Sequence, residues 1–195
     1  MDCNEGQYAE VIDKSKASPL FTQKFLMREL EIWPRLRHRH IIQVERMFQI
    51  QDRIYVFMEL APGGSVIEYV QRYGAVDENV GRNWCQTIFS DTYCGSSSYV
   101  APEVIESQPY DPIKADIWSA GVCIYVILNN AMPFDDSNLT RMHEDQVTRN
   151  WDFAPKIKKN ISSSAKNLVA RLLEPDPSKR PSMEQVLNCS WMRTR

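Results

Sequence analysis

The sequence predicts an α+β fold in which a small mixed unit precedes a mainly helical one. Strand-like and helical stretches alternate over the first 60 residues, whereas apolar residues recur at helical spacing over much of the rest of the chain. Pro62-Gly63-Gly64 lies between the two patterns and is a strong break in any helix or strand. We therefore expect two parts, residues 1–61 and residues 62–195.

Three strands and one helix are expected in the first part. A strand over Tyr8–Asp13 precedes a helix over Leu20–Leu36, near whose end a proline should kink or stop it. Two further strands, Ile41–Gln49 and Arg53–Leu60, flank a pair of residues that suits a hairpin turn, Gln51-Asp52. Together these elements predict a small antiparallel sheet with one helix.

The second part is predicted to be mostly helical. Apolar spacing and capping residues place helices over 65–73, 77–89, 113–129, 139–148, 162–173 and 182–189. The stretch Asp91–Tyr99 is short and polar and is expected to be a loop, and Asp176-Pro177-Ser178 is expected to be a turn.

Composition excludes several classes of protein. Of 195 residues, 43% are hydrophobic and 25% charged, which is the balance of a globular protein, and the net charge of −2 argues against a nucleic-acid partner. The longest apolar run, Ala120–Leu128, is far shorter than a membrane span, so no membrane association is expected. The cysteines are odd in number with no C-x-x-C pair, which favours reduced thiols in a cytoplasmic protein without a structural metal.

Several short motifs, read in order, resemble the C-terminal lobe of a protein kinase. They are Tyr99-Val100-Ala101-Pro102-Glu103, Asp116-Ile117-Trp118-Ser119-Ala120-Gly121-Val122, Pro133-Phe134, and Asp176-Pro177-Ser178-Lys179-Arg180-Pro181. The Ala-Pro-Glu tripeptide belongs to the kinase signature set. In detail the chain is most similar to the testis-specific serine/threonine kinases of the calmodulin-dependent kinase group. The resemblance therefore implies a truncated kinase-like fold, with part of an N-terminal lobe and most of a C-terminal lobe.

The same resemblance implies roles for individual residues. A vestigial ATP hinge would include Met58, Glu59 and Ala61, and Glu29 would be the glutamate of the regulatory helix. The end of the activation segment would include Thr92, Gly95 and Ser96. The structural motifs of the C-terminal lobe would be carried by Ala101, Pro102, Glu103, Asp116, Trp118, Gly121 and Arg180, with Glu103 and Arg180 forming a buried ion pair.

The catalytic residues of the family are missing from this sequence. There is no G-x-G-x-x-G loop, and Glu10 aligns with the lysine that pairs with ATP phosphates. Neither H-R-D followed by Asn nor D-F-G lies ahead of Ala101, because Phe89-Ser90 continues directly into Asp91-Thr92. The resemblance thus implies an internal deletion at the 90/91 junction, no catalytic residue and no metal ligand.

Three interpretations remain open at this point. The chain is predicted to be a pseudokinase-like or truncated product that cannot catalyse and acts by binding proteins, which are kinase substrates or regulatory partners. Alternatively, it is an incomplete isoform or gene model of an active ATP-dependent serine/threonine kinase, or a fragment that does not fold stably. Intact family members use ATP and Mg²⁺, but no cofactor is expected for this chain.

The junction should also disturb the helical unit. Residues 86–90 and 91–98 are expected to leave regular structure so that the chain can close the gap. The face of the central helix that carries Val122, Tyr125 and Val126 should lose part of its cover, and Asp116 should become a buried carboxylate without a partner.

Overall fold

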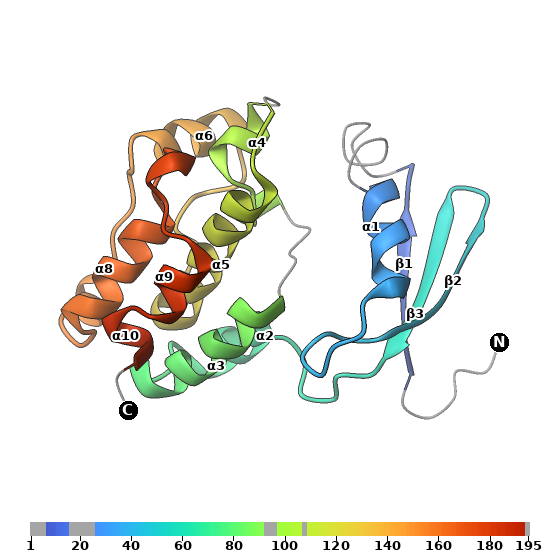
Figure 1. The fold of residues 1–195 in the computed structure, drawn as a ribbon, viewed down its shortest axis with the longest axis horizontal. Coiled ribbons are helices and arrows are strands. Elements are labelled where there is room, and N and C mark those ends of the chain that lie inside the picture. Colours follow the sequence, from blue (N-terminus) through green and yellow to red (C-terminus); the bar gives the residue numbers. More distant parts are fainter. Residues whose placement is uncertain (1–6, 16–25, 92–96, 107–108, 194–195) are drawn as a thin grey trace. The chain divides into compact units, whose positions relative to one another are not determined.

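The chain forms two compact units, residues 1–64 and residues 65–195. The structure, a computed structural model, describes residues 7–15, 26–91, 97–106 and 109–193. A small sheet with a short helix comes first and a set of helices follows, so the predicted α+β architecture is confirmed (Figure 1).

The first unit is a three-stranded antiparallel sheet with the strand order β1-β3-β2. Its buried core consists of Leu26, Val44, Ile54 and Val56. Gln51 adopts a positive φ of 53° in the turn that joins β2 to β3, where the hairpin was predicted. The elements are β1 (Gln7–Asp13), α1 (Met27–Ile32), the 3₁₀ turn η2 (Trp33–Arg35), β2 (Val44–Ile50) and β3 (Arg53–Glu59).

Strand β2 and the helix differ most from the sequence prediction in this unit. Strand β2 begins at Val44 rather than Ile41, and a register shift between Val44 and Arg46 interrupts its pairing with β3. The described part of the predicted helix tightens into η2 at Pro34, which lacks the N–H group that an α-helix would need there.

The second unit contains all six helices predicted for it, together with short helical turns that the sequence analysis missed. The missed segments, α4, α7 and α10, are only four residues long and show little periodicity. The elements are α2 (Val66–Tyr73), α3 (Glu78–Asp91), η3 (Ser97–Tyr99), α4 (Pro102–Ile105), α5 (Pro112–Asn129), α6 (Leu139–Val147), α7 (Pro155–Lys158), α8 (Ser163–Leu172), η4 (Pro177–Lys179), α9 (Met183–Leu187) and α10 (Ser190–Arg193).

Helix α5 organises this unit. It begins behind Asp111, whose side chain accepts a hydrogen bond from the N–H of Ile113, and it ends at Asn130 in the left-handed conformation. Most of its residues are buried, and it packs against α2, α3 and α8. A β-carbon added to Gly121 would lie 2.7 Å from Cβ of Leu172, so glycine permits the close approach of α5 to α8.

The expected disturbance at the junction is not found in the described residues. Helix α3 continues across residues 90 and 91 and ends at Asp91, and η3 begins at Ser97. The face of α5 is also covered, because Val122, Tyr125 and Val126 are all at most 5% exposed. The ring of Tyr125 packs against Phe153, which follows α6 in the chain and supplies cover that the sequence analysis did not foresee. Residues 92–96 lie outside the described part.

Candidate functional site

Arg180 is the most completely bonded side chain among the predicted site residues. Its guanidinium donates to both carboxylate oxygens of Glu103, at 2.7 and 2.8 Å, and its side chain is fully buried. The remaining three N–H groups donate to the backbone carbonyl oxygens of Glu174, Lys114 and Pro175, at 2.6, 2.8 and 3.1 Å. All five donors of the guanidinium therefore have acceptors. The buried ion pair expected between Glu103 and Arg180 is formed.

The segment that carries Glu103 is fixed to the helices on both sides of it. Pro102 occupies the first turn of α4, where its missing N–H costs nothing, and Ala101 is buried at the N-cap. Just before it, the carbonyl of Tyr99 accepts a hydrogen bond from the Ser119 hydroxyl on α5, at 2.9 Å. The carbonyl of Val100 accepts another from Gln146 on α6, at 3.0 Å. The Ala-Pro-Glu segment is thus positioned by two helices as well as by its own ion pair.

Trp118 lies beneath this ion pair. Its ring is fully buried, stacks on Phe134 with 5.7 Å between centroids, and lies 5.0 Å from the guanidinium carbon of Arg180. The cation and the aromatic face add a favourable contact to the five hydrogen bonds. Trp118 and Arg180 therefore belong to one packed cluster, which Gly121 extends towards α8.

Asp116 differs from the expectation of a buried carboxylate. Its side chain is solvent-exposed on the first half of α5, and no hydrogen bond connects it to the described residues. Even so, surrounding protein atoms withdraw part of its hydration and Asp111 adds a second negative charge, which together raise the pKa of Asp116 to about 6. The pKa of this carboxylate therefore lies above the ordinary range of an aspartate.

The predicted hinge residues lie at the end of β3 and just beyond it. Met58 is half-buried and pairs with Tyr8 and Val44 in the sheet, while the N–H of Glu59 donates to the carbonyl of Gln43 at 3.0 Å. The carbonyl of Ala61 accepts from the N–H of Gly64 at 3.2 Å. The N–H of Glu59 and the carbonyl of Ala61 are therefore bonded within the first unit.

The other predicted site residues are only partly described. Glu10 is exposed on β1, where the resemblance would place the phosphate-binding lysine. The backbone of Glu29 is in α1, but its side chain lies outside the described part, as do Thr92, Gly95 and Ser96. Within residues 7–15, 26–91, 97–106 and 109–193, no three His, Cys, Asp or Glu side chains gather as a metal site.

The sequence analysis missed a second polar cluster, around Glu78 at the start of α3. The Glu78 carboxylate accepts from the backbone N–H and the hydroxyl of Ser162 and from the indole N–H of Trp191, each at 2.7 Å. Burial works to raise the pKa of Glu78, but these bonds and the charge of Arg82 outweigh it and lower the pKa. The cluster ties α3 to α8 and α10, over separations of 84 and 113 residues that no local pattern reveals.

Comparison with known proteins assigns the family. The family model described as the protein kinase domain matches residues 9–91 and 86–192, which together cover most of the chain. The chain belongs to the protein kinase family. Its two matched stretches overlap at residues 86–91, around the junction noted in the sequence.

The similar curated proteins include testis-specific serine/threonine kinases. Kinase 2 of this group from Mus musculus is 30% identical over 94% of this chain and 65% of its own length. Kinase 3 from Mus musculus is 34% identical over 94% of this chain and 85% of its own length. The chain therefore spans about two thirds of the length of kinase 2. That alignment covers 235 positions, whereas 94% of 195 residues is only about 183, so about 50 positions have no residue in this chain.

A solved structure confirms the fold. The crystal structure of Rad53 residues 1–466 in complex with AMP-PNP matches with a TM-score of 0.74 and 26% identity, over 95% of this chain and 58% of that one. The truncated kinase-like fold predicted from the sequence is therefore confirmed. None of the helices that the structure describes combines the length and apolar content needed to cross a bilayer.

Proposed function

We propose that this chain is a protein-kinase-family member that does not transfer phosphate and acts by binding other proteins. Phosphoryl transfer needs an oriented base, metal ions bound by carboxylate or amide side chains, and a cation on the phosphates. We propose that this chain has no such base, metal ligands or phosphate-binding cation, although it has the structural cluster around Arg180.

The observation that carries the proposal is the shortness of the connection between α3 and η3. Only residues 92–96, Thr-Tyr-Cys-Gly-Ser, separate Asp91 from Ser97. Fully extended, this connection spans at most about 22 Å, and none of its five side chains is a carboxylate, an amide or an imidazole. The segment in which kinases carry H-R-D, Asn and D-F-G has no counterpart there. The gap of about 50 positions in the alignment to kinase 2 supports an internal deletion of this kind.

The first unit supports the same proposal. Glu10 places a negative charge where the family has its phosphate-binding lysine, and ATP phosphates are negative as well. We therefore propose that any nucleotide site is vestigial and that the chain needs neither ATP nor Mg²⁺, and we place it in the cytoplasm.

A second candidate function is that of an active serine/threonine kinase of which this chain is an incomplete product. The observation that favours it is the intact sequence on both sides of the junction, which the family model matches as two separate stretches. Sequencing the transcript across the codons for Phe89 to Thr92 distinguishes the two. A transcript that encodes about 50 additional residues at this point would support the active kinase.

The activity itself is tested with labelled ATP and a generic protein substrate. We expect no transfer above an enzyme-free blank from the purified chain, nor from a Glu10→Lys variant, because a restored lysine cannot replace the base and the metal ligands. The control is Glu29→Ala, which removes the family's partner for that lysine. Transfer that persists in Glu29→Ala would indicate a contaminating kinase, whereas transfer that Glu29→Ala abolishes would overturn the proposal.

A further inference from the structure

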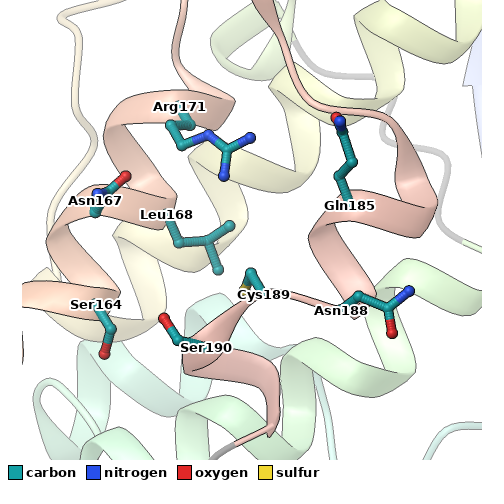
Figure 2. A pocket seen from close by; sticks show the side chains of 8 residues that line it. All are labelled: Ser164, Asn167, Leu168, Arg171, Gln185, Asn188, Cys189 and Ser190. Carbon is teal, nitrogen blue, oxygen red and sulfur yellow. The ribbon is translucent and has the colours of Figure 1, made fainter.

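A pocket of about 400 Å³ lies between α8, α9 and the start of α10, away from every residue to which the family resemblance assigns a role. Figure 2 shows the side chains of α8 on one side of it and those of the α9–α10 segment on the other. Its lining consists of Ser164, Asn167, Leu168, Arg171, Gln185, Asn188, Cys189 and Ser190.

Arg171 is the cation at the edge of this pocket. It is exposed in the last turn of α8, and its guanidinium extends into the space between α8 and α9 (Figure 2). Within the part of the chain that the structure describes, Arg171 makes no hydrogen bond and no ion pair. No acidic side chain lines the pocket, so nothing there neutralises this charge.

Two amides on the facing side have their nitrogens available as donors. The Oε1 atom of Gln185 accepts the N–H of Ser182 at 2.9 Å, and Oδ1 of Asn188 accepts from Arg193 at 2.7 Å. Because the oxygens are engaged, the nitrogen ends of both amides can still donate, and neither donates to another group within the described residues. The amide of Asn188 is turned away from Arg171 in Figure 2, so the pocket combines one cation with one neutral donor on the facing helix, the Gln185 amide.

The floor of the pocket is apolar. Leu168 is 3% exposed and Cys189 is half-buried beside it, and both side chains point into the pocket in Figure 2. A ligand that fits must place a charged, acceptor-rich group at Arg171 and a short hydrocarbon stem over Leu168. Acidic and phosphorylated side chains of proteins have this form.

We propose that this pocket binds an anionic side chain of a partner protein, a carboxylate or a phosphate, with Arg171 as its main binding residue. A guanidinium can hold two oxygens of either group at once. The site lies wholly within the helical unit, so it does not depend on whether the chain binds ATP or transfers phosphate.

The test is a titration of the full ¹⁵N-labelled chain followed by NMR. The probes are alanine pentapeptides, blocked at both ends, with phosphoserine, glutamate or serine at the centre, and inorganic phosphate as a fourth. We expect saturable shifts of the backbone signals of residues 188–190 and of the Arg171 Nε–H with a charged peptide, and none with the serine peptide. Tighter binding of the phosphoserine peptide than of the glutamate peptide would identify phosphate as the ligand group. Equal binding of these two peptides would mean that the pocket binds a carboxylate and a phosphate alike.

Two variants make the test specific. Arg171→Ala should weaken binding by about 10- to 100-fold, the value of a charge-assisted hydrogen bond. Gln185→Glu can still accept the Ser182 N–H but adds a negative charge at the rim, and it should weaken binding without unfolding α9. The matched control is Arg141→Ala, which removes an exposed arginine from α6. Binding that survives Arg171→Ala, equal binding of the serine peptide, or binding of inorganic phosphate alone would overturn the proposal.

Discussion

Substitutions in the Glu103–Arg180 pair should destabilise the helical unit by different and predictable amounts. Glu103→Gln removes the charge that balances Arg180 but leaves the guanidinium its three backbone acceptors. Breaking a buried pair from one side costs about 3–5 kcal/mol, and the three remaining bonds place Glu103→Gln near 3 kcal/mol. Arg180→Met breaks the same pair from the other side, which costs about 3 kcal/mol or more, and it also leaves the carbonyls of Glu174 and Pro175 without this donor, at about 1 kcal/mol each, so the total should be about 5 kcal/mol.

Urea unfolding followed by tryptophan fluorescence measures both losses, and the double variant measures the coupling. We expect the double variant to cost at least about 1.5 kcal/mol less than the sum of the single variants, because the two residues share one set of bonds. Lys179→Ala serves as the control. It removes an exposed pair with Asp176 next to Arg180, and it should leave the unfolding midpoint unchanged.

The reasoning fails if the order of the two losses is reversed. A loss for Arg180→Met no greater than that for Glu103→Gln would mean that the three carbonyl bonds contribute nothing. Losses below 1 kcal/mol for both variants would mean that water reaches the pair in solution, contrary to its burial in the structure.

Three further predictions follow from individual residues. Gly121→Ala should destabilise the helical unit by about 1–3 kcal/mol in urea unfolding, because the added methyl group would overlap Leu172, and a more stable variant would refute this close packing. Asp116→Asn should be more stable than the parent chain at pH 7.5 and equal to it at pH 4. The raised pKa of Asp116, about 6, means that the folded state binds more protons than the unfolded state between about pH 4 and 6, so the parent chain loses stability as the pH rises. For a fully buried side chain, the gain in unfolding free energy of Asp116→Asn at pH 7.5 would be about 3 kcal/mol, and the exposure of Asp116 reduces this gain to about 1 kcal/mol. An Asp116→Asn variant that is less stable than the parent chain at pH 7.5 would show that the Asp116 carboxylate makes a stabilising bond. Millimolar ATP with Mg²⁺ should leave the melting temperature unchanged. A ligand that does bind stabilises the folded chain by about 2.7 kcal/mol at a hundred times its Kd, so a saturable rise in melting temperature would show that the chain has a nucleotide site.

The sequence predicted the elements with strong periodicity and the contacts that a motif encodes. The long helix α5 and the Glu103–Arg180 pair are examples, the first from its apolar run and the second from the family resemblance. The Glu78 cluster could not be predicted, because its partners are distant in sequence and belong to no motif. The exposure of Asp116 was also missed, since the resemblance gives the position of a carboxylate but not the surroundings that remain when a neighbouring segment is absent.

The two ends of the junction are held to the same helical core by separate contacts, which explains why the fold persists across it. On the early side, the N–H of Val76 donates to the carbonyl of Ile127 on α5, and Glu78 bonds to Ser162. On the late side, Tyr99 bonds to Ser119 on the same helix α5. Neither set of contacts uses residues 92–96, so the length of the connection can change without loss of the bonds that position α3 or η3. Loop length alone alters stability only slowly. These contacts are the physical basis on which, under the proposed function, the helical unit keeps its fold without a catalytic segment between α3 and η3.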